Sequence, residues 1–533
     1  MTKYIFVTGG VVSGIGKGIS GASLGRLLKD RGLSVFMQKM DPYINVDPGT
    51  ISPYQHGEVF VTKDGGETDL DLGHYERFID EELTINSSIT SGKVYNAVIQ
   101  RERRGEYEGA TVQVIPHITD EIKQKVYSVA RQSGADVIIT EIGGTVGDIE
   151  SLPFIEAIRQ IHAENSREDV LFVHTTLIPK IPSSGELKTK PTQHSYKELM
   201  SLGIKPNIFI IRCEDVITDD IKEKISLFCD VPVEAIVQSY NVDFIYEVPL
   251  SLKAQGLDDY VLHKLNLDLP DSDLSEWKSV VKRYKETTQT LSIGLVGKYV
   301  ALHDAYLSVS QALEDAGYAL GHRVEIQWID SEEINEKNAS NILAGLDGII
   351  IPSGFGRRGI DGMILASRFA REHRVPYFGI GLGMQTAMID LARHEFGMEG
   401  ADSTEFNPDT PYPIIDRMVG QDEDTRLGGT LRLGNYTCEL KPGTMAYEAY
   451  GKDKIDERHR HRFEFNNAFK ERFEEEGVVV SGMHSPLDLV EIIEWPAHPF
   501  FVGCQFHPEF RSRPNKIHPL FEAFIRASIN YKE

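Results

Sequence analysis

The chain has 533 residues, of which 41% are hydrophobic, and a formal net charge of −24 at pH 7. This length exceeds what one hydrophobic core usually covers, so two or three domains are expected. The acidic balance argues against nonspecific nucleic-acid binding, and no apolar run approaches the roughly 20 residues of a membrane span. Because a strand pattern begins at once and the chain holds only four cysteines, we expect no signal peptide, no disulfide framework and a cytoplasmic location.

Residues 1 to about 266 alternate short apolar runs with helical patterns, which favours a parallel sheet covered by helices. Strands are predicted at 4–7, 34–37, 136–140, 170–174 and 207–211.

A glycine-rich loop at 8–18 follows the first predicted strand and precedes a helical pattern. Its glycines let backbone N–H groups approach a polyphosphate, the helix start adds positive potential, and Lys17 supplies a cation. The loop departs from a Walker A pattern at Val11, where glycine is usual, and at Gly18, where Ser or Thr would bind Mg²⁺. We therefore predict a variant phosphate loop with metal ligands elsewhere; the alternative is a plain glycine-rich turn.

Two acidic residues are candidates for those metal ligands, which should be hard oxygens. Glu141 ends a predicted strand, so its carboxylate should project at the carboxyl edge of the sheet, where open α/β sheets bind ligands. Asp71 is the second candidate, although an acidic surface loop explains it equally well on spacing alone. Asp148 and Glu150 flank a flexible turn and serve either as helix N-terminal acids or as acceptors for a ligand.

The segment 187–195 combines two lysines, hydroxyl groups and an amide around a proline. This composition suits a second anionic ligand, although solvated loops often look the same. Lys224 lies in a helical pattern, where a lysine is more often a plain surface residue.

A polar stretch at 266–275 is followed by an amphipathic helical pattern with Trp277, Val280, Val281 and Tyr284 on one face. We interpret this region as a linker. A second α/β series begins at 291–296 and continues at 348–351 and 376–380, and its tail at 478–480, 489–493 and 500–506 predicts closely spaced, partly antiparallel strands.

A strand that breaks into Gly-x-nucleophile-x-Gly before a helix is typical of a nucleophile elbow, and 379–383 has this pattern. Gly381 stands where Ser or Cys is expected. Downstream, His507 and Glu509 offer a base and its orienting acid, and the loop at 352–359 could direct N–H groups at an oxyanion. Cys504 lies in the strand leading to His507, so it cannot replace the missing nucleophile. The pattern predicts a catalytic triad without its attacking atom.

Taken together, these residues resemble the CTP synthase family over nearly the whole chain, and the C-terminal half is similar to class I glutamine amidotransferase domains. The motifs that carry the resemblance are the variant phosphate loop and the segments 39–50, 55–59, 141–150, 188–195, 457–463 and 505–509. The resemblance implies an α/β protein with a P-loop-like, Rossmann-type amidoligase domain at 1–266. A linker at 267–290 and an α/β amidotransferase domain at 291–533 follow.

The resemblance also implies a ligase that forms a C–N bond in pyrimidine nucleotide biosynthesis. Such an enzyme binds ATP with Mg²⁺, transfers the γ-phosphoryl group to the 4-oxygen of UTP, and then admits ammonia to give CTP. CTP is a feedback inhibitor, GTP an allosteric activator of glutamine hydrolysis, and the family forms homotetramers and filaments. No nucleic-acid or membrane partner is implied.

The resemblance distributes roles over the matching positions. ATP is expected at Ser13, Gly14, Ile15, Gly16, Lys17, Gly18, Lys39 and Asp71, and Mg²⁺ at Asp71 and Glu141. UTP or CTP is expected at Ser13, Asp148, Ile149, Glu150, Lys188, Thr189, Lys190, Pro191, Thr192, Gln193 and Lys224. Glutamine is expected at Gly354, Leu382, Gln385, Glu405 and Arg462, with His56 near an ammonia gate and Arg358 in a lid.

The chain departs from the family at Gly381, where the family has Cys. Losing a nucleophile can cost roughly 10⁶ in turnover, and glycine tolerates the strained bend, so the domain should fold without cleaving glutamine. We therefore expect an ammonia-dependent enzyme that still binds glutamine, whether the substitution is natural or engineered. The alternatives are a catalytically silent nucleotide-binding assembly or regulatory protein, and another ATP-dependent amidoligase with the same pair of domains.

Overall fold

A computed structural model describes residues 2–272, 274–418 and 430–533. The chain forms two compact units. The first comprises residues 1–47 and 71–281, and the second comprises residues 48–70 and 282–533.

The first unit is built on a seven-stranded sheet in which every neighbouring pair is parallel. Its order is β5 (Ser88–Thr90), β2 (Val35–Asp41), β6 (Val137–Ile142), β1 (Lys3–Gly9), β7 (Val170–Leu177), β8 (Ile208–Arg212) and β9 (Ile236–Ser239). The five strands predicted in this region are confirmed. The sequence patterns missed β5 and β9, which are short edge strands.

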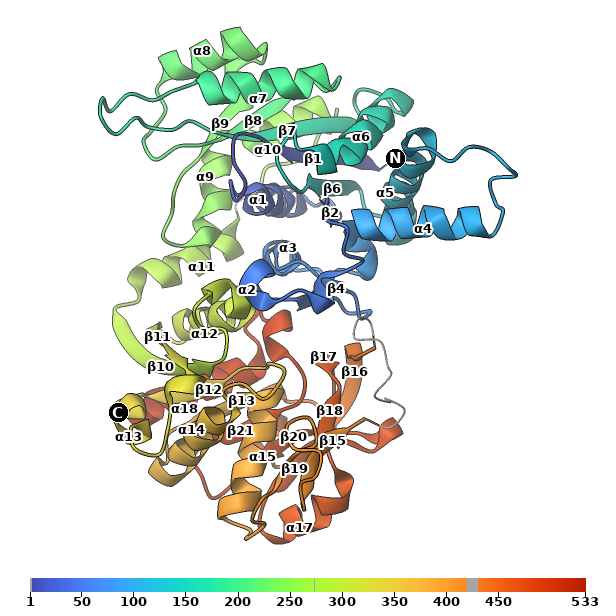
Figure 1. The fold of residues 1–533 in the computed structure, drawn as a ribbon. Coiled ribbons are helices and arrows are strands. Elements are labelled where there is room, and N and C mark those ends of the chain that lie inside the picture. The colour runs from blue at the N-terminus through green and yellow to red at the C-terminus, as the bar shows by residue number, and fades with distance from the viewer. Residues whose placement is uncertain (1, 273, 419–429) are drawn as a thin grey trace. The chain divides into compact units, whose positions relative to one another are not determined.

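Helices cover both faces of this sheet (Figure 1). One face carries α1 (Lys17–Asp30), α3 (Asp71–Ile79), α9 (Val248–Ala254) and α10 (Leu257–Lys264). The other carries α4 (Ser91–Arg103), α5 (Thr119–Ser133), α6 (Leu152–Glu164), α7 (Lys190–Ser201) and α8 (Asp219–Cys229). This doubly covered parallel sheet is the architecture that the alternating pattern predicts.

The predicted amphipathic helix is α11 (Ser275–Glu286), and its Trp277, Val280 and Val281 are buried. Within the first unit, the indole N–H of Trp277 donates to the carbonyl of Tyr246 at 2.7 Å. The Trp277 ring also packs 5.6 Å from that of Phe78.

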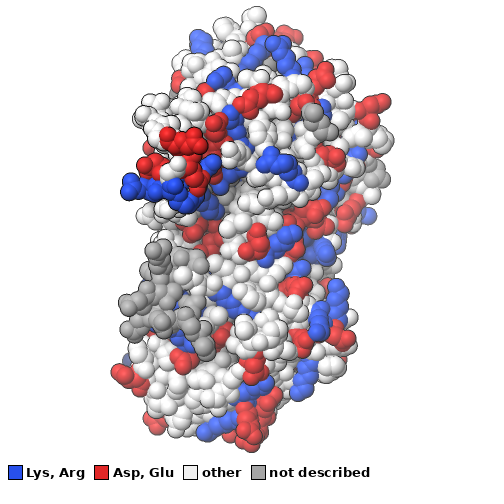
Figure 2. Space-filling view, turned by 90° about the vertical axis from the view of Figure 1, so that its right-hand side faces the viewer, with Lys and Arg blue, Asp and Glu red and all other residues white. Residues whose placement is uncertain are grey.

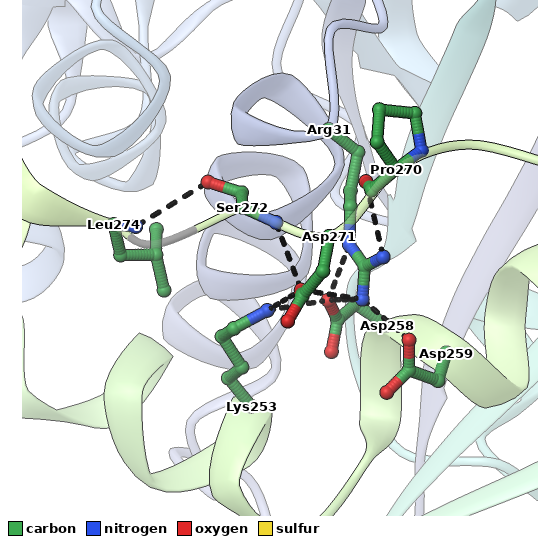
Figure 3. A network of polar contacts seen from close by, with 8 residues as sticks. All are labelled: Arg31, Lys253, Asp258, Asp259, Pro270, Asp271, Ser272 and Leu274. Atoms are coloured by element: carbon green, nitrogen blue, oxygen red, sulfur yellow. Dashed lines mark hydrogen bonds and ion pairs between the residues drawn. The ribbon is translucent and has the colours of Figure 1, made fainter.

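A polar network fixes the chain that leads toward α11 against the C-terminal end of α1 (Figure 3). Arg31 donates to Asp258 through Nε at 2.9 Å and to the carbonyl of Pro270 at 3.2 Å, and it also pairs with Asp259. Lys253 pairs with Asp271, whose carboxylate also accepts from the Ser272 N–H at 2.8 Å. The helix that follows the phosphate loop is thereby anchored at its far end.

The second unit is built on a nine-stranded sheet whose first five strands are parallel and whose last four pair antiparallel. Its order is β11 (His322–Asp330), β10 (Gln289–Gly297), β12 (Gly348–Ile351), β13 (Tyr377–Ile380), β21 (Phe501–Cys504), β20 (Leu489–Glu494), β19 (Val479–His484), β16 (Arg432–Leu440) and β17 (Lys454–His461). The predicted antiparallel tail is confirmed. One face packs against α13 (Ala339–Leu343), α14 (Ile360–His373), α15 (Leu382–His394) and α17 (Lys470–Glu475), and the other against α12 (Leu307–Ala319), α16 (Met445–Tyr450) and α18 (Pro519–Lys532).

Residues 48–70 come early in the chain but belong to the second unit. They hold α2 (Pro53–His56) and the hairpin of β3 (Phe60–Val61) and β4 (Glu67–Thr68). The Glu58 carboxylate accepts from the Ser308 N–H at 2.8 Å, and Arg460 donates to Glu67 at 2.9 Å. The second unit also contains a small sheet of β14 (Asp402–Ser403), β15 (Pro413–Arg417) and β18 (Phe463–Phe465).

Figure 2 shows Lys and Arg side chains interspersed with Asp and Glu over the face that it draws. In the part of the chain that the structure describes, no helix combines the length and apolar character needed to cross a bilayer.

Candidate active sites

The phosphate loop connects β1 to α1 in the first unit. Lys17 begins α1, and its ammonium donates to the carbonyl of Gly144 at 2.8 Å. Val11 adopts φ of 78°, which a β-branched side chain rarely does. Residues in such conformations persist where the surroundings enforce them and cluster at functional sites. The conformation also explains why the common loop pattern prefers glycine at this position.

The two predicted metal ligands converge at the start of α1. Asp71 begins α3, and Glu141 lies near the end of β6. A Cβ built on Gly18 would lie 2.8 Å from Oδ1 of Asp71 and 3.2 Å from Oε2 of Glu141. The two carboxylates therefore face one point beside the phosphate loop.

Other side chains hold these carboxylates in place. Lys39 pairs with Asp71, and the Tyr75 hydroxyl donates to Glu141. Burial raises the pKa of Glu141, the charge of Asp71 raises it further, and Lys39 and Lys17 oppose both effects. A cation bound here would relieve the repulsion between the carboxylates.

This donor set fits Mg²⁺, which is commonly bound by one or two carboxylates together with substrate phosphates. Among residues 2–272, 274–418 and 430–533 there is no group of three or more His, Cys, Asp or Glu side chains arranged for a metal. Phosphate oxygens and water would therefore complete the coordination around Asp71 and Glu141.

The predicted second anion segment forms the start of α7, with Pro191 in its first turn. Thr192 donates to the carbonyl of Leu177 at 3.2 Å, which fixes this helix start to the end of β7. Lys188 pairs with Glu186 at 2.7 Å. The pKa of Glu186 is lowered mainly by that hydrogen bond and also by the charge of Lys224, so α8 brings Lys224 toward the same segment.

The turn at 143–150 follows β6. The Asp148 carboxylate accepts from the Thr145 N–H at 2.8 Å, so it holds the turn as well as facing solvent. Ile149 and Glu150 are exposed at the tip.

Two side chains near the phosphate loop were missed by sequence reasoning. His174 in β7 bridges the hydroxyls of Thr8 and Ser195 at 2.8 Å each, and burial lowers its pKa to about 3, so it is neutral. Arg212 ends β8 and places a guanidinium nitrogen 3.8 Å from a Cβ built on Gly16. Both lie toward the carboxyl ends of predicted strands, where open α/β sheets bind ligands, and this position could have identified them from the sequence.

The elbow of the second unit has the predicted geometry. Gly381 joins β13 to α15 with φ of 53° and ψ of −105°, and its N–H donates to the carbonyl of Cys504 at 2.7 Å. A Cβ on Gly379 would lie 2.6 Å from the carbonyl carbon of Gly383, and one on Gly383 would collide with the carbonyl of Ile351. The flanking glycines are therefore required by the close approach of the backbone.

The predicted base and acid are also in place. Nδ1 of His507 lies 2.7 Å from Oε1 of Glu509, and the ring stacks on Phe510. Nε2 of His507 is buried, and no described residue hydrogen-bonds to it. His507 and Glu509 line a cavity of about 120 Å³ together with Ser353 and neighbouring loop residues.

Cys504 cannot supply the missing thiol. It is buried in β21, its sulfur lies 3.5 Å from the carbonyl of Phe506, and burial raises its pKa well above the usual value. A thiol held neutral in this way is a poor nucleophile.

Several predicted glutamine ligands lie in or against the loop at 352–359. Gly354 lies against Leu382, and the Glu405 carboxylate accepts from the Gly356 N–H at 2.7 Å. Burial raises the pKa of Glu405, and the Gly356 N–H and the charges of Lys298 and Arg462 oppose this rise. Gln385 donates to the carbonyl of Phe463 at 2.8 Å, and its role in glutamine binding stays a prediction.

The predicted lid residue Arg358 is bound within the second unit. It donates to the carbonyl of Lys298 at 2.8 Å and to the hydroxyl of Tyr54 at 3.3 Å. His56 ends α2, and its Nε2 lies 3.2 Å from Asp69. The segment that carries His56 also supplies wall residues to the His507 cavity, including Gly49, Ile51, Pro53, Glu58 and Val59.

Comparison with known proteins agrees with this arrangement. The family model described as CTP synthase N-terminus matches residues 3–267, and that described as Glutamine amidotransferase class-I matches residues 301–527. The CTP synthase of Caldanaerobacter subterraneus subsp. tengcongensis is 58% identical over 532 residues, which cover 100% of this chain and 99% of that relative. This chain belongs to the CTP synthase family.

The CTP synthase of Bacillus subtilis is 57% identical over 529 residues, or 99% of both chains. Among solved structures, the glutaminase domain of Trypanosoma brucei CTPS with bound acivicin is 36% identical, with a TM-score of 0.43, and covers 45% of this chain and 94% of that one. Membership in the CTP synthase family confirms the resemblance, the two-part α/β architecture and the ligase class.

Proposed function

We propose that this chain is a CTP synthase that takes its nitrogen from free ammonia and not from glutamine. The observation that carries the proposal is a contrast between the two units. In the first, Lys17, Lys39, Asp71 and Glu141 gather at the phosphate loop. In the second, the elbow that should present a nucleophile has Gly381.

The first unit has the groups that phosphoryl transfer requires, which are positioning and charge stabilisation rather than a protein nucleophile. The backbone of 13–18 would hold the phosphates of ATP, while Asp71 and Glu141 would hold Mg²⁺, which neutralises phosphate charge when bound. Lys17 and Lys39 would stabilise the γ-phosphoryl group as it passes to the 4-oxygen of UTP. Ammonia then attacks carbon 4 of the uracil ring, and phosphate leaves with the former 4-oxygen.

The start of α7 and the turn at 143–150 support a site for UTP and for inhibitory CTP. Lys188 pairs with Glu186, and the charge of Lys224 also acts on that carboxylate; a nucleotide triphosphate would replace it as the partner of these lysines. Arg212 would face the nucleotide at the phosphate loop. GTP activation and a homotetramer, with filaments, are proposed from family membership.

The second unit should bind glutamine without cleaving it. His507 and Glu509 can orient a proton transfer, but the covalent step needs a nucleophile at 381. General base catalysis by His507 on water lacks that positioned step. The predicted glutamine ligands would still hold the amino acid: Gly354, Leu382, Gln385, Glu405 and Arg462.

The test compares CTP formation from UTP and ATP with ammonium salt and with glutamine as nitrogen donors. We expect synthesis with ammonium salt and none above background with glutamine. Glutamine-supported synthesis at a comparable rate would contradict the proposal. UTP binding with no CTP at high ammonium would instead favour the regulatory alternative, and turnover of another acid substrate would favour a different amidoligase.

A further inference from the structure

Ser353 lies against the position from which a nucleophile would project. A Cβ built on Gly381 would be 2.7 Å from Oγ of Ser353 and 3.1 Å from its Cβ. Real Cβ atoms essentially never approach another heavy atom to less than 3.0 Å, and the second distance is also tighter than normal packing. The space for a side chain at 381 is therefore partly filled by Ser353.

This obstruction differs from the one at the neighbouring glycines of the elbow. At Gly379 and Gly383 an added Cβ would meet backbone atoms, which no single substitution removes. At Gly381, the three heavy atoms closest to an added Cβ all belong to Ser353, and two of them are side-chain atoms. The obstruction at the nucleophile position is therefore set by the identity of one residue.

The loop that carries Ser353 is anchored two and three residues further along the chain, at Phe355 and Gly356, which limits how far Ser353 can move away. Lys298 donates through Nζ to the carbonyls of Phe355, at 2.9 Å, and Gly356. The Gly356 N–H donates to Glu405 at 2.7 Å. A rotation of the serine side chain would move Oγ away but would leave its Cβ at 3.1 Å from the new atom.

We propose that Ser353 occupies the place of the nucleophile's side chain, so that glutamine hydrolysis is silenced by two residues, Ser353 and Gly381, and not by one. This inference rests on the proposed function, because it explains how the amidotransferase half is inactive. It has a direct consequence: Gly381→Cys alone restores a thiol that is strained and misplaced, and the serine must be reduced in size before that thiol can act.

The experiment uses the full-length unaltered chain, Ser353→Ala alone, and Gly381→Cys, alone and combined with Ser353→Ala or Ser353→Gly. Ala removes the hydroxyl and keeps the Cβ, whereas Gly removes both, so the series separates the two contacts. Glutamate released from glutamine is measured for each protein. A second readout is alkylation of the introduced thiol by a glutamine analogue bearing a chloromethyl ketone, located by peptide mass, with iodoacetamide as the reagent that needs no amino-acid pocket.

Among the proteins with Gly381→Cys, we expect glutamate release to rise as residue 353 changes from Ser to Ala to Gly. The variant with Ser353→Gly should be about 10-fold or more faster than Gly381→Cys alone, because relieving one overpacked contact has an effect of this size. The glutamine analogue should label the thiol in the same order. If no variant releases glutamate, faster labelling in the double variants still supports the proposal. The proposal is overturned if all proteins with Gly381→Cys release glutamate at the same rate. If none of them releases glutamate, it is overturned if the glutamine analogue labels their thiols equally fast.

Two controls use the same set of proteins. Thermal unfolding of each variant shows whether a low rate reflects lost structure. Ammonia-supported CTP formation tests the proposed function independently, because that chemistry uses the first unit. Glutamate release by the unaltered chain that Ser353→Ala abolishes would make Ser353 a nucleophile and overturn its blocking role.

Discussion

Asp71 and Glu141 lie far apart in the sequence, yet their carboxylates face one point at the start of α1. A Cβ at Gly18 would be 2.8 Å from the first and 3.2 Å from the second. The common Walker A pattern places a Ser or Thr hydroxyl at this position to bind Mg²⁺. In this chain the glycine makes room for the two carboxylates, which would take over that role.

The first prediction is that Asp71→Asn and Glu141→Gln each lower ammonia-supported CTP formation by about 10²–10³-fold, the range for losing one preorganised electrostatic group. Each substitution keeps the shape but removes a charge that would bind Mg²⁺. The Mg²⁺ concentration for half-maximal activity should rise in parallel. Tyr75→Phe, which removes only the hydrogen bond to Glu141, should have a smaller effect.

Glu223→Gln is the matched control, because this carboxylate is exposed on α8. Its activity and Mg²⁺ dependence should match those of the unaltered chain. Unchanged Mg²⁺ dependence in both Asp71→Asn and Glu141→Gln would show that these residues do not hold the metal.

The second prediction concerns the network at the end of α1 (Figure 3). Arg31 is buried, and its partner Asp258 is completely buried. Among the described residues, Arg31→Ala leaves this carboxylate paired only with the Lys253 ammonium, at 3.3 Å. We expect a loss of about 3 kcal/mol in the free energy of unfolding, measured by denaturant titration. Arg103→Ala removes an exposed pair and should cost less than about 0.5 kcal/mol. Similar losses in both variants would contradict the importance of burial.

Much of the fold could be predicted because its signals are local. Apolar runs marked the central strands of both sheets but missed β5 and β9 in the first and β11, β16 and β17 in the second. The spacing of the glycines at 379–383 marked the elbow, since backbone approach requires glycine at the flanking positions. Glu141 was placed correctly because a residue at the end of a parallel strand must lie at the carboxyl edge.

The remainder depends on contacts between residues distant in sequence. Hydrophobic periodicity could not show that 48–70 joins the second unit, because that placement depends on partners such as Ser308 and Arg460. Periodicity also could not show that His174 contacts Ser195, or that Ser353 lies against Gly381. The assignment of individual residues to ATP, UTP and glutamine stays a prediction.

The third prediction is a pH dependence of stability due to Lys298. Its side chain is buried, and desolvation lowers its pKa from 10.5 to about 8. Between these values the unfolded chain binds more protons than the folded one, so the contribution of Lys298 to the free energy of unfolding rises with pH. The free energy of unfolding of the unaltered chain, minus that of Lys298→Met, should therefore increase from pH 8 to pH 10, by roughly 3 kcal/mol at most.

Denaturant titrations at several pH values measure this difference, and subtraction of the variant removes the titration of all shared groups. A difference that stays constant from pH 8 to pH 10 would show that the ammonium is not desolvated. A difference that shrinks with rising pH would mean that the pKa is raised and that the hydrogen bonds to Phe355 and Gly356 outweigh burial.

The fourth prediction is that glutamine binds to the second unit and stays intact. Glu405 accepts from the Gly356 N–H in the loop that faces Gly381, and this half-buried carboxylate could pair with the ammonium group of a ligand. Glu405→Gln should weaken glutamine binding by about 10-fold or more, since a hydrogen bond to a charged group contributes about 1.5–3 kcal/mol. Isothermal titration calorimetry measures the affinity, and analysis of the recovered ligand shows whether it was cleaved. Glu399→Gln, at an exposed position beyond α15, is the control and should bind normally. No heat of binding for the unaltered chain, or equal affinity in Glu405→Gln, would show that the pocket does not recognise the amino acid in this way.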